Sequence, residues 1–376
     1  MPTVMTGSSM VSCLGDLDST YEALLAGRGG VSELRYGAPD KLNVHYAYGI
    51  DEPDGEDGLR LAGRWLARCV AGALRDAGVD PARRRVAVIV GTGLRELRAV
   101  EQWHGDGAPM RAARLHFDEA VRSVAPDVTE VHTIANACAA SGYALGLAAD
   151  LLELGEADAV VAAGCDAMTE SMLAIIGRVT EHPSDAVRPF DADRRGVLLG
   201  EGAVAVVLER PGDISRPPLG VLRGVGLKCD AFHETAPDRA GIVATIREAH
   251  ERAGVDSGQV DLVLAHGTST ALNDPTEAAA LLEVFGPDGP PVTAIKGAVG
   301  HTSGGAALMS LLVALEAIRT GQVPPVVGLS TPIPEAAELR LVHGGPLASR
   351  PRVAQINAFG FGGVNAVAIV EAGDAQ

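Results

Sequence analysis

The chain has 376 residues, of which 47% are hydrophobic, 21% charged and only 3% aromatic, a profile typical of one or two globular domains with an aliphatic core. Its net charge of −17 disfavours binding to nucleic acid or to an anionic membrane. No run reaches the about 18 apolar residues of a membrane span, and we expect no signal peptide. The five cysteines form no CxxC pair and the histidines have no metal-ligand spacing. We therefore expect a cytoplasmic chain with reduced thiols.

Apolar periodicity in the first part of the chain predicts alternating strands and helices. Strands are expected at residues 3–14 (with a turn), 85–90, 131–135, 157–163 and 197–209. Helices are expected at 17–26, at 59–77, over parts of 94–125 and after Cys138. The Gly, Pro and Asp content of 27–58 predicts a surface loop.

A Pro-rich, charged segment at 210–218 predicts a linker, after which a similar order of elements begins again. Helices are expected at 241–253, 276–284 and 301–320, and strands at 260–265, 292–295, 353–358 and 366–371. We therefore predict two halves, residues 1–212 and 213–376.

The stretch from Ile134 to Gly155, IANACAASGYALGLAADLLELG, places a cysteine where an apolar run ends and a helix begins. The helix has no polar face, so it is expected at the centre of the protein. Its first turn carries unpaired N–H groups and the positive end of the helix dipole, which favour a thiolate on Cys138. An inert buried thiol is the alternative interpretation.

Both halves contain a buried strand followed by a glycine turn, and an apolar helix preceded by a reactive side chain. That side chain is Cys138 in the first half and His301 in the second, and the dipeptide SG recurs at Ser141-Gly142 and Ser303-Gly304. We infer an internal duplication in which the two helices pack together and their N-termini lie near one point.

Reactive side chains follow several predicted strands, the usual place for ligands in α/β proteins. They are Cys138, His266, Lys296 and His301, together with the doubled Phe-Gly of residues 359–363. A cysteine beside a histidine is a common activated nucleophile, and two neutral histidines can donate hydrogen bonds to an oxyanion. Taken singly, each has an ordinary alternative: a capping histidine, a surface lysine paired with Glu277 or Asp274, or a tight glycine turn.

Six ordered segments, which extend over nearly the whole chain, resemble the β-ketoacyl-acyl-carrier-protein synthases, the elongating type of the thiolase superfamily. The segments are Thr6-Gly7 with the following MVSCLG, NACAASG around Cys138, RPFDADRRGVLLGEGA from Arg188, AHGTSTALNDPTEA from Ala265, IKGAVGHTSGGAA from Ile295 and NAFGFGGVNA from Asn357. The resemblance implies a thiolase-like α/β fold, with two pseudo-duplicated βα halves forming a layered α-β-α-β-α sandwich.

The resemblance also implies the main chemical roles. Cys138 would take an acyl chain from a carrier-bound thioester, with the backbone N–H groups of Cys138 and Phe361 as oxyanion hole. His266 and His301 would stabilise the enolate formed when malonyl-acyl carrier protein loses CO₂, and that carbanion would attack the acyl-cysteine. This decarboxylative Claisen condensation serves fatty acid or polyketide synthesis and needs no metal or other cofactor.

Supporting roles follow from the same resemblance. Lys296, held by Glu277, would support the histidine pair; Thr268 and Thr270 would bind the phosphopantetheine arm of the substrate; and Phe361 would act as a gate. The expected partners are an acyl carrier protein and a second subunit, either a copy of the chain or a ketosynthase-like protein, with no nucleic acid and no membrane.

The chain departs from the family in a short segment between Gly93 and Cys138 and in Asn136, where threonine is more usual. A silent subunit of the chain-length-factor kind is an alternative, although such subunits typically lack the cysteine. A Cys-dependent acyltransferase or hydrolase without condensation is another. A degradative thiolase would need a second cysteine near the C-terminus, and none follows Cys229.

Overall fold

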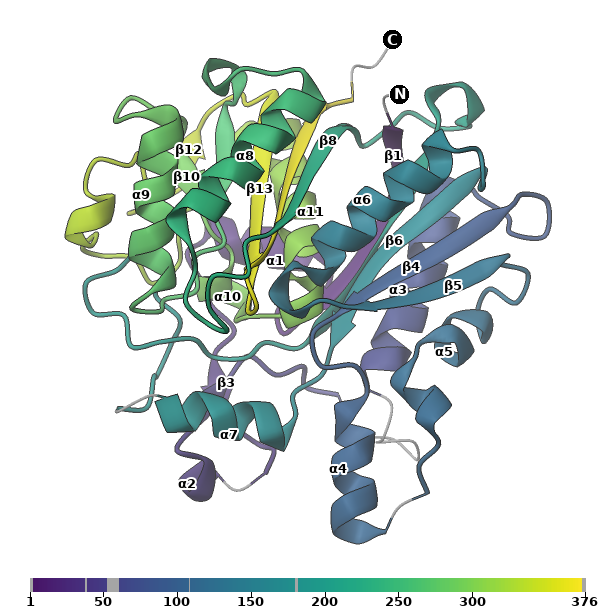
Figure 1. Cartoon of the computed structure of the whole chain (residues 1–376), viewed down its shortest axis with the longest axis horizontal. Helices are drawn as coiled ribbons and strands as arrows, with labels where there is room; N and C mark the ends of the chain where they lie inside the picture. The colour runs from purple at the N-terminus through teal and green to yellow at the C-terminus, as the bar shows by residue number, and fades with distance from the viewer. Residues whose placement is uncertain (1–2, 38, 53–60, 108, 180–181, 374–376) are drawn as a thin grey trace.

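The computed structural model describes residues 3–37, 39–52, 61–107, 109–179 and 182–373. Its centre is a mixed sheet with the strand order β10-β9-β13-β14-β8-β1-β7-β6-β4-β5 (Figure 1). The strands from the first part of the chain are β1 (Thr3–Ser12), β4 (Val86–Thr92), β5 (Glu130–Ala135), β6 (Ala159–Asp166) and β7 (Gly202–Glu209). Those from the second part are β8 (Gly220–Cys229), β9 (Leu262–Leu264), β10 (Val292–Thr293), β13 (Val353–Gly360) and β14 (Val364–Ala372).

The helices cover both faces of this sheet. They are α1 (Leu17–Leu25), α2 (Pro39–Leu42), α3 (Leu61–Ala77), α4 (Leu97–Asp106), α5 (Asp118–Arg122), α6 (Ala140–Glu153), α7 (Glu170–Val179), α8 (Arg239–Ala253), α9 (Asn273–Phe285), α10 (Lys296–Val299) and α11 (Ala306–Thr320). Short pairs of strands lie outside the main sheet: β2 (Ser32–Glu33) with β3 (Tyr46–Ala47), and β11 (Gln322–Val323) with β12 (Leu347–Ala348).

The two parts of the sheet repeat one topology. The order β1-β7-β6-β4-β5 in one part corresponds to β8-β14-β13-β9-β10 in the other. In the first part β6, β4 and β5 are parallel and β7 is antiparallel to both of its neighbours. In the second part β13, β9 and β10 are parallel and β14 is antiparallel to both of its neighbours. The parts join where Thr3–Met5 of β1 pairs with 220–222 of β8.

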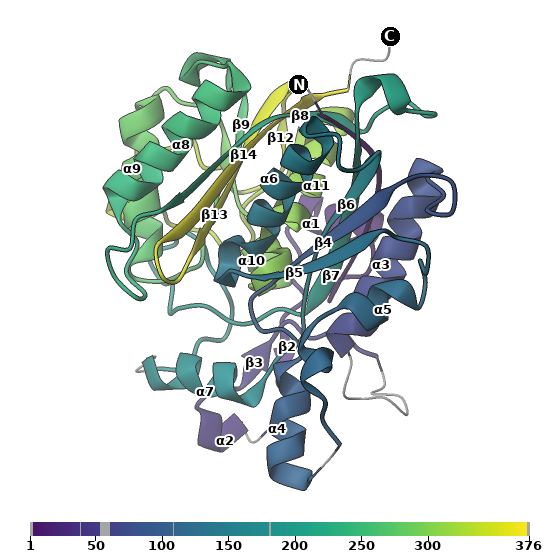
Figure 2. The same cartoon turned by 45° about the vertical axis from the view of Figure 1, so that its right-hand side comes forward.

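Helices α6 and α11 contact each other at the centre, between the two arms of the sheet (Figure 2). Ala144 and Leu145 of α6 share one core with Leu308 and Leu311 of α11 and with the inner faces of the strands. A second core joins α3 to the outer face of β4, β6 and β7, and a third joins α8 and α9 to β9, β13 and β14. The layers therefore follow the order α-β-α-β-α, which confirms the predicted duplicated sandwich.

The apolar character of the central layer makes one helical segment resemble a membrane span. Ser303–Thr320 has 18 residues and a mean hydropathy of 1.2, so within the described ranges it alone passes a test of length and composition for a membrane-crossing helix. However, 78% of this segment is buried inside the protein. The expectation that no run of about 18 apolar residues exists still holds, because Ser310, Glu316 and Arg319 interrupt this segment. Its high hydropathy is that of a core helix buried on most of its sides.

Several predicted boundaries also need correction. The range 27–58, predicted to be a surface loop, contains β2, α2 and β3, while its residues 38 and 53–58 lie outside the described ranges. Tyr48 in this range is fully buried, and its hydroxyl donates to the Gly297 carbonyl (3.1 Å) and accepts from the Val187 N–H (3.0 Å). Helix α7 and strand β8 lie in ranges for which the pattern predicted no element. Within 197–209, predicted to be strand, β7 covers only Gly202–Glu209.

The duplicated helices align differently from the repeated SG dipeptides. Each helix follows a short 3-10 turn, Ala137–Ala139 before α6 and Ser303–Gly305 before α11. The first residue of each turn has a left-handed backbone, with φ of 48° at Ala137 and 46° at Ser303. In this alignment Cys138 corresponds to Gly304, whereas Ser141-Gly142 lies one turn further along, inside α6. The two SG dipeptides are therefore not at equivalent positions, although the two halves do repeat one structure.

Gly304→Ala is expected to lower the free energy of unfolding by about 1–3 kcal/mol, the usual cost of overpacking. A Cβ at this position would lie 2.3 Å from the Cα of Thr92 and 2.8 Å from Oδ2 of Asp166. Denaturant unfolding would measure the loss. The matched control is Gly258→Ala, also in a 3-10 turn, where a Cβ meets nothing within 4 Å. Equal stability of the two variants would contradict the close packing.

Candidate active site

Cys138 lies in the 3-10 turn between β5 and α6, and its side chain is partly buried. Burial raises the pKa of its thiol to about 11. The charge of Lys296 and hydrogen bonds from the backbone N–H groups of Phe361 and Cys138 itself oppose this effect. The expectation that the helix terminus favours a thiolate was therefore wrong for the free protein, because desolvation outweighs the N–H groups and the nearby positive charge.

The two predicted histidines lie side by side. His266 follows β9 and His301 follows α10, and their ring centroids are 5.5 Å apart at an interplanar angle of 83°. Burial, reinforced by the charge of Lys296, holds the pKa of both imidazoles well below the usual range, so both are neutral. Neither ring nitrogen of His301 has a hydrogen-bond partner within the described part of the chain. Such a buried, unpaired donor is available to a ligand.

Lys296, the first residue of α10, lies beneath the histidine pair. Its Nζ donates to the His266 carbonyl and lies 3.3 Å from Nδ1 of the same residue. Burial lowers the pKa of Lys296 to about 8, although the charge of Glu277 opposes the shift. The predicted direct contact between Lys296 and Glu277 is absent from the ion pairs and hydrogen bonds of the described residues, because the carboxylate faces backbone N–H groups instead.

Two buried carboxylates on α9 hold the loop that carries His266. Glu277 accepts from the N–H groups of His266 (2.7 Å) and Gly267 (2.8 Å). Asp274 accepts from the N–H groups of Thr268 (3.0 Å) and Ser269 (3.1 Å), and burial raises its pKa to about 6. The sequence indicated these acids only as possible partners of the lysine. Their observed role is to fix the backbone on which the imidazole sits.

Thr268 and Thr270 lie on this same loop. Their hydroxyl oxygens are 2.9 Å apart, and the Thr270 hydroxyl also accepts from the N–H of Asn273 at 3.1 Å. Between them Ser269 has a left-handed backbone (φ 67°) and a fully buried side chain. The structure therefore places both threonine hydroxyls within a few residues of His266, in a tightly bonded turn.

Phe361 begins the turn between β13 and β14, and 52% of its side chain is exposed. The next two residues have left-handed backbones, with φ of 88° at Gly362 and 76° at Gly363. A Cβ on Gly363 would lie 2.1 Å from Oδ1 of Asp230, so this turn requires glycine. The turn presents the Phe361 N–H to the Cys138 sulfur while leaving the aromatic ring on the surface.

Asp166 is a site residue that the sequence reasoning missed. Its buried carboxylate accepts from the Thr92 hydroxyl (2.6 Å), from the N–H groups of Gly93 and Leu94 (2.8 Å each) and from that of Gly304 (2.6 Å). Burial raises its pKa to about 6, and its charge in turn raises the pKa of Cys138. The available signal was an acid at the end of an otherwise apolar strand, where an ordinary surface carboxylate is unexpected.

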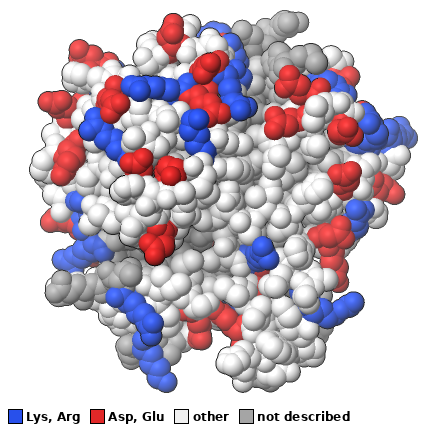
Figure 3. Space-filling view, in the orientation of Figure 1, with Lys and Arg blue, Asp and Glu red and all other residues white. Residues whose placement is uncertain are grey.

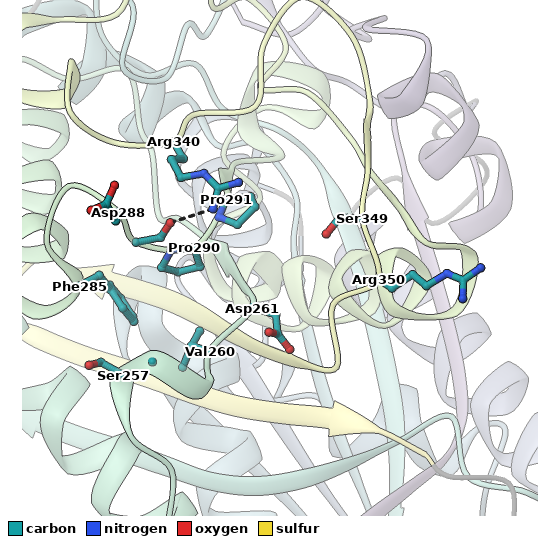
Figure 4. A pocket seen from close by; sticks show the side chains of 12 residues that line it. Ser257, Val260, Asp261, Phe285, Asp288, Pro290, Pro291, Arg340, Ser349 and Arg350 are labelled. Atoms are coloured by element: carbon teal, nitrogen blue, oxygen red, sulfur yellow. Dashed lines mark hydrogen bonds between the residues drawn. The ribbon is translucent and has the colours of Figure 1, made fainter.

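These residues do not line either of two cavities found in the described part of the structure. The cavity in Figure 4, of about 360 Å³, lies between 257–261, 285–291 and the Arg340 side chain, which donates to the Gly289 carbonyl. Another, of about 490 Å³, adjoins Tyr36 and Trp65. Within the described ranges, no three His, Cys, Asp or Glu side chains are grouped to hold a metal ion.

Comparison with known proteins agrees with this arrangement. The family described as "Beta-ketoacyl synthase, N-terminal domain" matches residues 2–213, and "Beta-ketoacyl synthase, C-terminal domain" matches 219–330. The 3-oxoacyl-[acyl-carrier-protein] synthase 2 of Rhizobium meliloti (strain 1021) is 31% identical over 416 residues, covering 98% of each chain.

Two solved structures are also similar. The ishigamide ketosynthase/chain length factor has a TM-score of 0.89 and 30% identity, and a beta-ketoacyl synthase from Burkholderia phymatum STM815 has a TM-score of 0.86 and 25% identity; each comparison covers 99% of both chains. The chain therefore belongs to the beta-ketoacyl synthase family of the thiolase superfamily. It is an acyl-transferring condensing enzyme.

Asp166→Asn is expected to destabilise the fold, because an amide NH₂ would replace one of the two oxygens that now accept backbone N–H groups. Each donor left unsatisfied costs about 1–3 kcal/mol, which denaturant unfolding would measure. The control is Asp213→Asn, which removes an exposed ion pair with Arg210 and is expected to cost about 0–1 kcal/mol. If the two variants lose the same free energy of unfolding, the backbone hydrogen bonds of Asp166 do not stabilise the fold as proposed.

The rate of Cys138 alkylation by iodoacetamide should rise about tenfold for each pH unit up to about pH 8, since only the thiolate reacts. Above that pH the rise should be less steep, because Lys296, with a pKa of about 8, loses its charge. Lys296→Met should slow the reaction, because the lysine charge lowers the pKa of the thiol. Mass spectrometry of the Cys138 peptide would follow the rate, with exposed Cys229 as an internal reference. A plateau below pH 9 would show that burial does not control this thiol.

Proposed function

We propose that the chain joins an acyl group, held as a thioester on Cys138, to a malonyl unit carried by an acyl carrier protein, with release of CO₂. The observation that carries the proposal is the pair of neutral, buried imidazoles 5.5 Å apart above a buried lysine. The name of the Rhizobium relative, a 3-oxoacyl-[acyl-carrier-protein] synthase, supports the same reaction and carrier.

In the first step the Cys138 sulfur attacks the acyl thioester and the carrier thiol leaves. The N–H groups of Phe361 and Cys138 act on the sulfur to lower its pKa, so they are placed to stabilise the oxyanion that forms at the attacked carbonyl. Lys296 favours the thiolate.

In the second step the malonyl thioester carbonyl accepts hydrogen bonds from His266 and His301. As the carboxylate leaves as CO₂, the electron pair of the broken C–C bond moves onto that carbonyl oxygen, and the two N–H donors stabilise the enolate. The carbanion then attacks the acyl carbonyl on Cys138, and the cysteine thiolate leaves. Neutral imidazoles suit this role, because they stabilise an oxyanion without transferring a proton to the reactive carbon.

We assign the hydroxyls of Thr268 and Thr270 to the phosphopantetheine arm. Both lie on the loop that carries His266, so an arm bound there would present its thioester to the imidazole pair. Phe361 is assigned as a gate, because its exposed ring and its sulfur-bonding N–H belong to one glycine turn. A movement of the turn would change access and the oxyanion hole together.

The proposed partners are an acyl carrier protein and a second ketosynthase-like subunit, either a copy of this chain or a different one, in the cytoplasm. β5 ends the strand order of the sheet, which leaves an edge for another chain to pair with. A similar solved structure is described as a ketosynthase/chain length factor, which supports a two-subunit assembly.

In Figure 3, acidic and basic side chains alternate around one face, whose middle is largely uncharged. With a net charge of −17, docking of an acidic carrier protein requires local arginines.

A silent subunit is the weaker candidate, because the chain keeps the cysteine and both histidines in one cluster. Acyl transfer without condensation is also disfavoured, since it would leave the unpaired His301 ring nitrogens without a use.

Incubation with acyl- and malonyl-carrier protein, followed by mass spectrometry, tests the reaction. The wild-type chain should give an acyl-enzyme, CO₂ and an extended product. Cys138→Ala should abolish acylation, while His301→Ala should lower decarboxylation by about 10²–10³-fold, as for the loss of one oxyanion donor, with a smaller effect on acyl transfer. Equal loss of both half-reactions in His301→Ala would refute its assigned role, and acylation without chain extension by the wild type would refute condensation.

A further inference from the structure

A line of buried polar side chains leads from α8 through β13 to the candidate site. Nε2 of His250 lies 2.7 Å from Oε1 of Gln355, Nε2 of Gln355 donates to Oδ1 of Asn357 (2.9 Å), and Nδ2 of Asn357 donates to Oε1 of Glu277 (3.0 Å). The exposed fractions of His250, Gln355, Asn357 and Glu277 are 7%, 0%, 2% and 0%. The line is therefore closed to solvent along nearly its whole length.

Every donor in this line points toward the carboxylate. Since Oε1 of Gln355 only accepts, the shared proton belongs to Nε2 of His250. Burial lowers the pKa of His250, so the imidazole is neutral and this tautomer suffices. Aligned hydrogen bonds polarise one another in a medium of low dielectric constant. The three side chains thus act as one oriented dipole chain that ends on the charge of Glu277.

The remaining contacts of Glu277 connect this chain to the site. Its Oε1 also accepts from the His266 N–H, and its Oε2 accepts from the Gly267 N–H and from Nδ2 of Asn273 at 3.3 Å. Its charge raises the pKa of Lys296. The orientation of this one carboxylate therefore affects both the backbone of the first histidine and the ammonium beneath the pair.

Burial alone does not require polar side chains here. The sheet neighbours of Gln355 are Val263 on β9 and Ile369 on β14, both buried and apolar. An apolar residue at 355 would avoid the cost of removing an amide from water, which is about 1–3 kcal/mol when its hydrogen bonds are incomplete. A buried polar network in an otherwise apolar layer is most readily explained by what it orients.

We propose that His250, Gln355 and Asn357 are positioning residues that fix Glu277 and, through it, the His266 side of the site. The inference rests on the proposed function, in that His266 serves the decarboxylation step. These three side chains contact no substrate and act only through Glu277. Their effect should therefore fall on the histidine-dependent half of the reaction, with little effect on acyl transfer to Cys138.

The test compares decarboxylation and acyl transfer in variants of the hydrogen-bonded residues. Asn357→Leu and Gln355→Leu should lower decarboxylation of malonyl-carrier protein by about tenfold or more, the usual effect of losing an outer-shell hydrogen bond. Acylation of Cys138 should stay within about twofold of the wild type, because the hydrogen bonds from His250 to Glu277 do not include Cys138 or Phe361. His250→Leu should resemble Gln355→Leu, whereas His250→Gln keeps a donor for Gln355 and should restore most of the activity.

The matched control is Thr245→Val on α8, the helix of His250. It removes the hydrogen bond from the buried Thr245 hydroxyl to the Gly241 carbonyl, which is not part of the line from His250 to Glu277. It should leave the ratio of the two half-reactions unchanged. A parallel loss of both half-reactions in the Asn357 and Gln355 variants, or no rescue by His250→Gln, would overturn the proposal.

Hydrogen exchange separates this inference from the proposed function. The peptide that contains His266 and Gly267 should exchange faster in Asn357→Leu than in the wild type, and Thr245→Val should not change it. If the wild type fails to decarboxylate malonyl-carrier protein, the proposed function is wrong, but faster exchange would still support the positioning chain. Unchanged exchange in Asn357→Leu would overturn it whatever the activity.

Discussion

Buried carboxylates that accept backbone N–H groups are the interaction on which the site depends. Asp166 binds the turn after β4 together with the start of α11, and Asp274 and Glu277 bind the loop after β9. A buried carboxylate needs hydrogen bonds to its oxygens in place of water. Moving any of these loops would therefore leave a carboxylate partly unpaired. The loops are therefore held in place before a substrate arrives, which is the arrangement that favours electrostatic catalysis.

The same burial sets the protonation states of the reactive groups. It raises the pKa of Cys138 and lowers those of Lys296, His266 and His301. Each shift disfavours a charge, and the cluster holds together because the groups offset one another: the lysine favours the thiolate and disfavours imidazolium. Chemistry that forms transient anions next to neutral donors fits such a site better than chemistry that passes protons through histidine.

Most of the fold and the members of the cluster were predictable, because buried strands such as β4 and β6 are continuous apolar runs and the ordered motifs are specific. Some parts were not. Tyr48 is buried by contacts from distant segments, which local composition cannot reveal. The partner of Glu277 depends on the direction of its side chain, which the spacing of residues in the sequence does not reveal. Gln355 and Asn357 look like ordinary polar residues of a strand, since their pairing with His250 and Glu277 exists only once the sheet is assembled.

The duplication also carries an asymmetry at its centre. Gly304 occupies the place that Cys138 has in the other half, and the backbone of Thr92 fills the space that a side chain would need. No nucleophile fits at that second place without rebuilding the turn after β4. The two equivalent turns of the duplicated architecture therefore present one thiol between them.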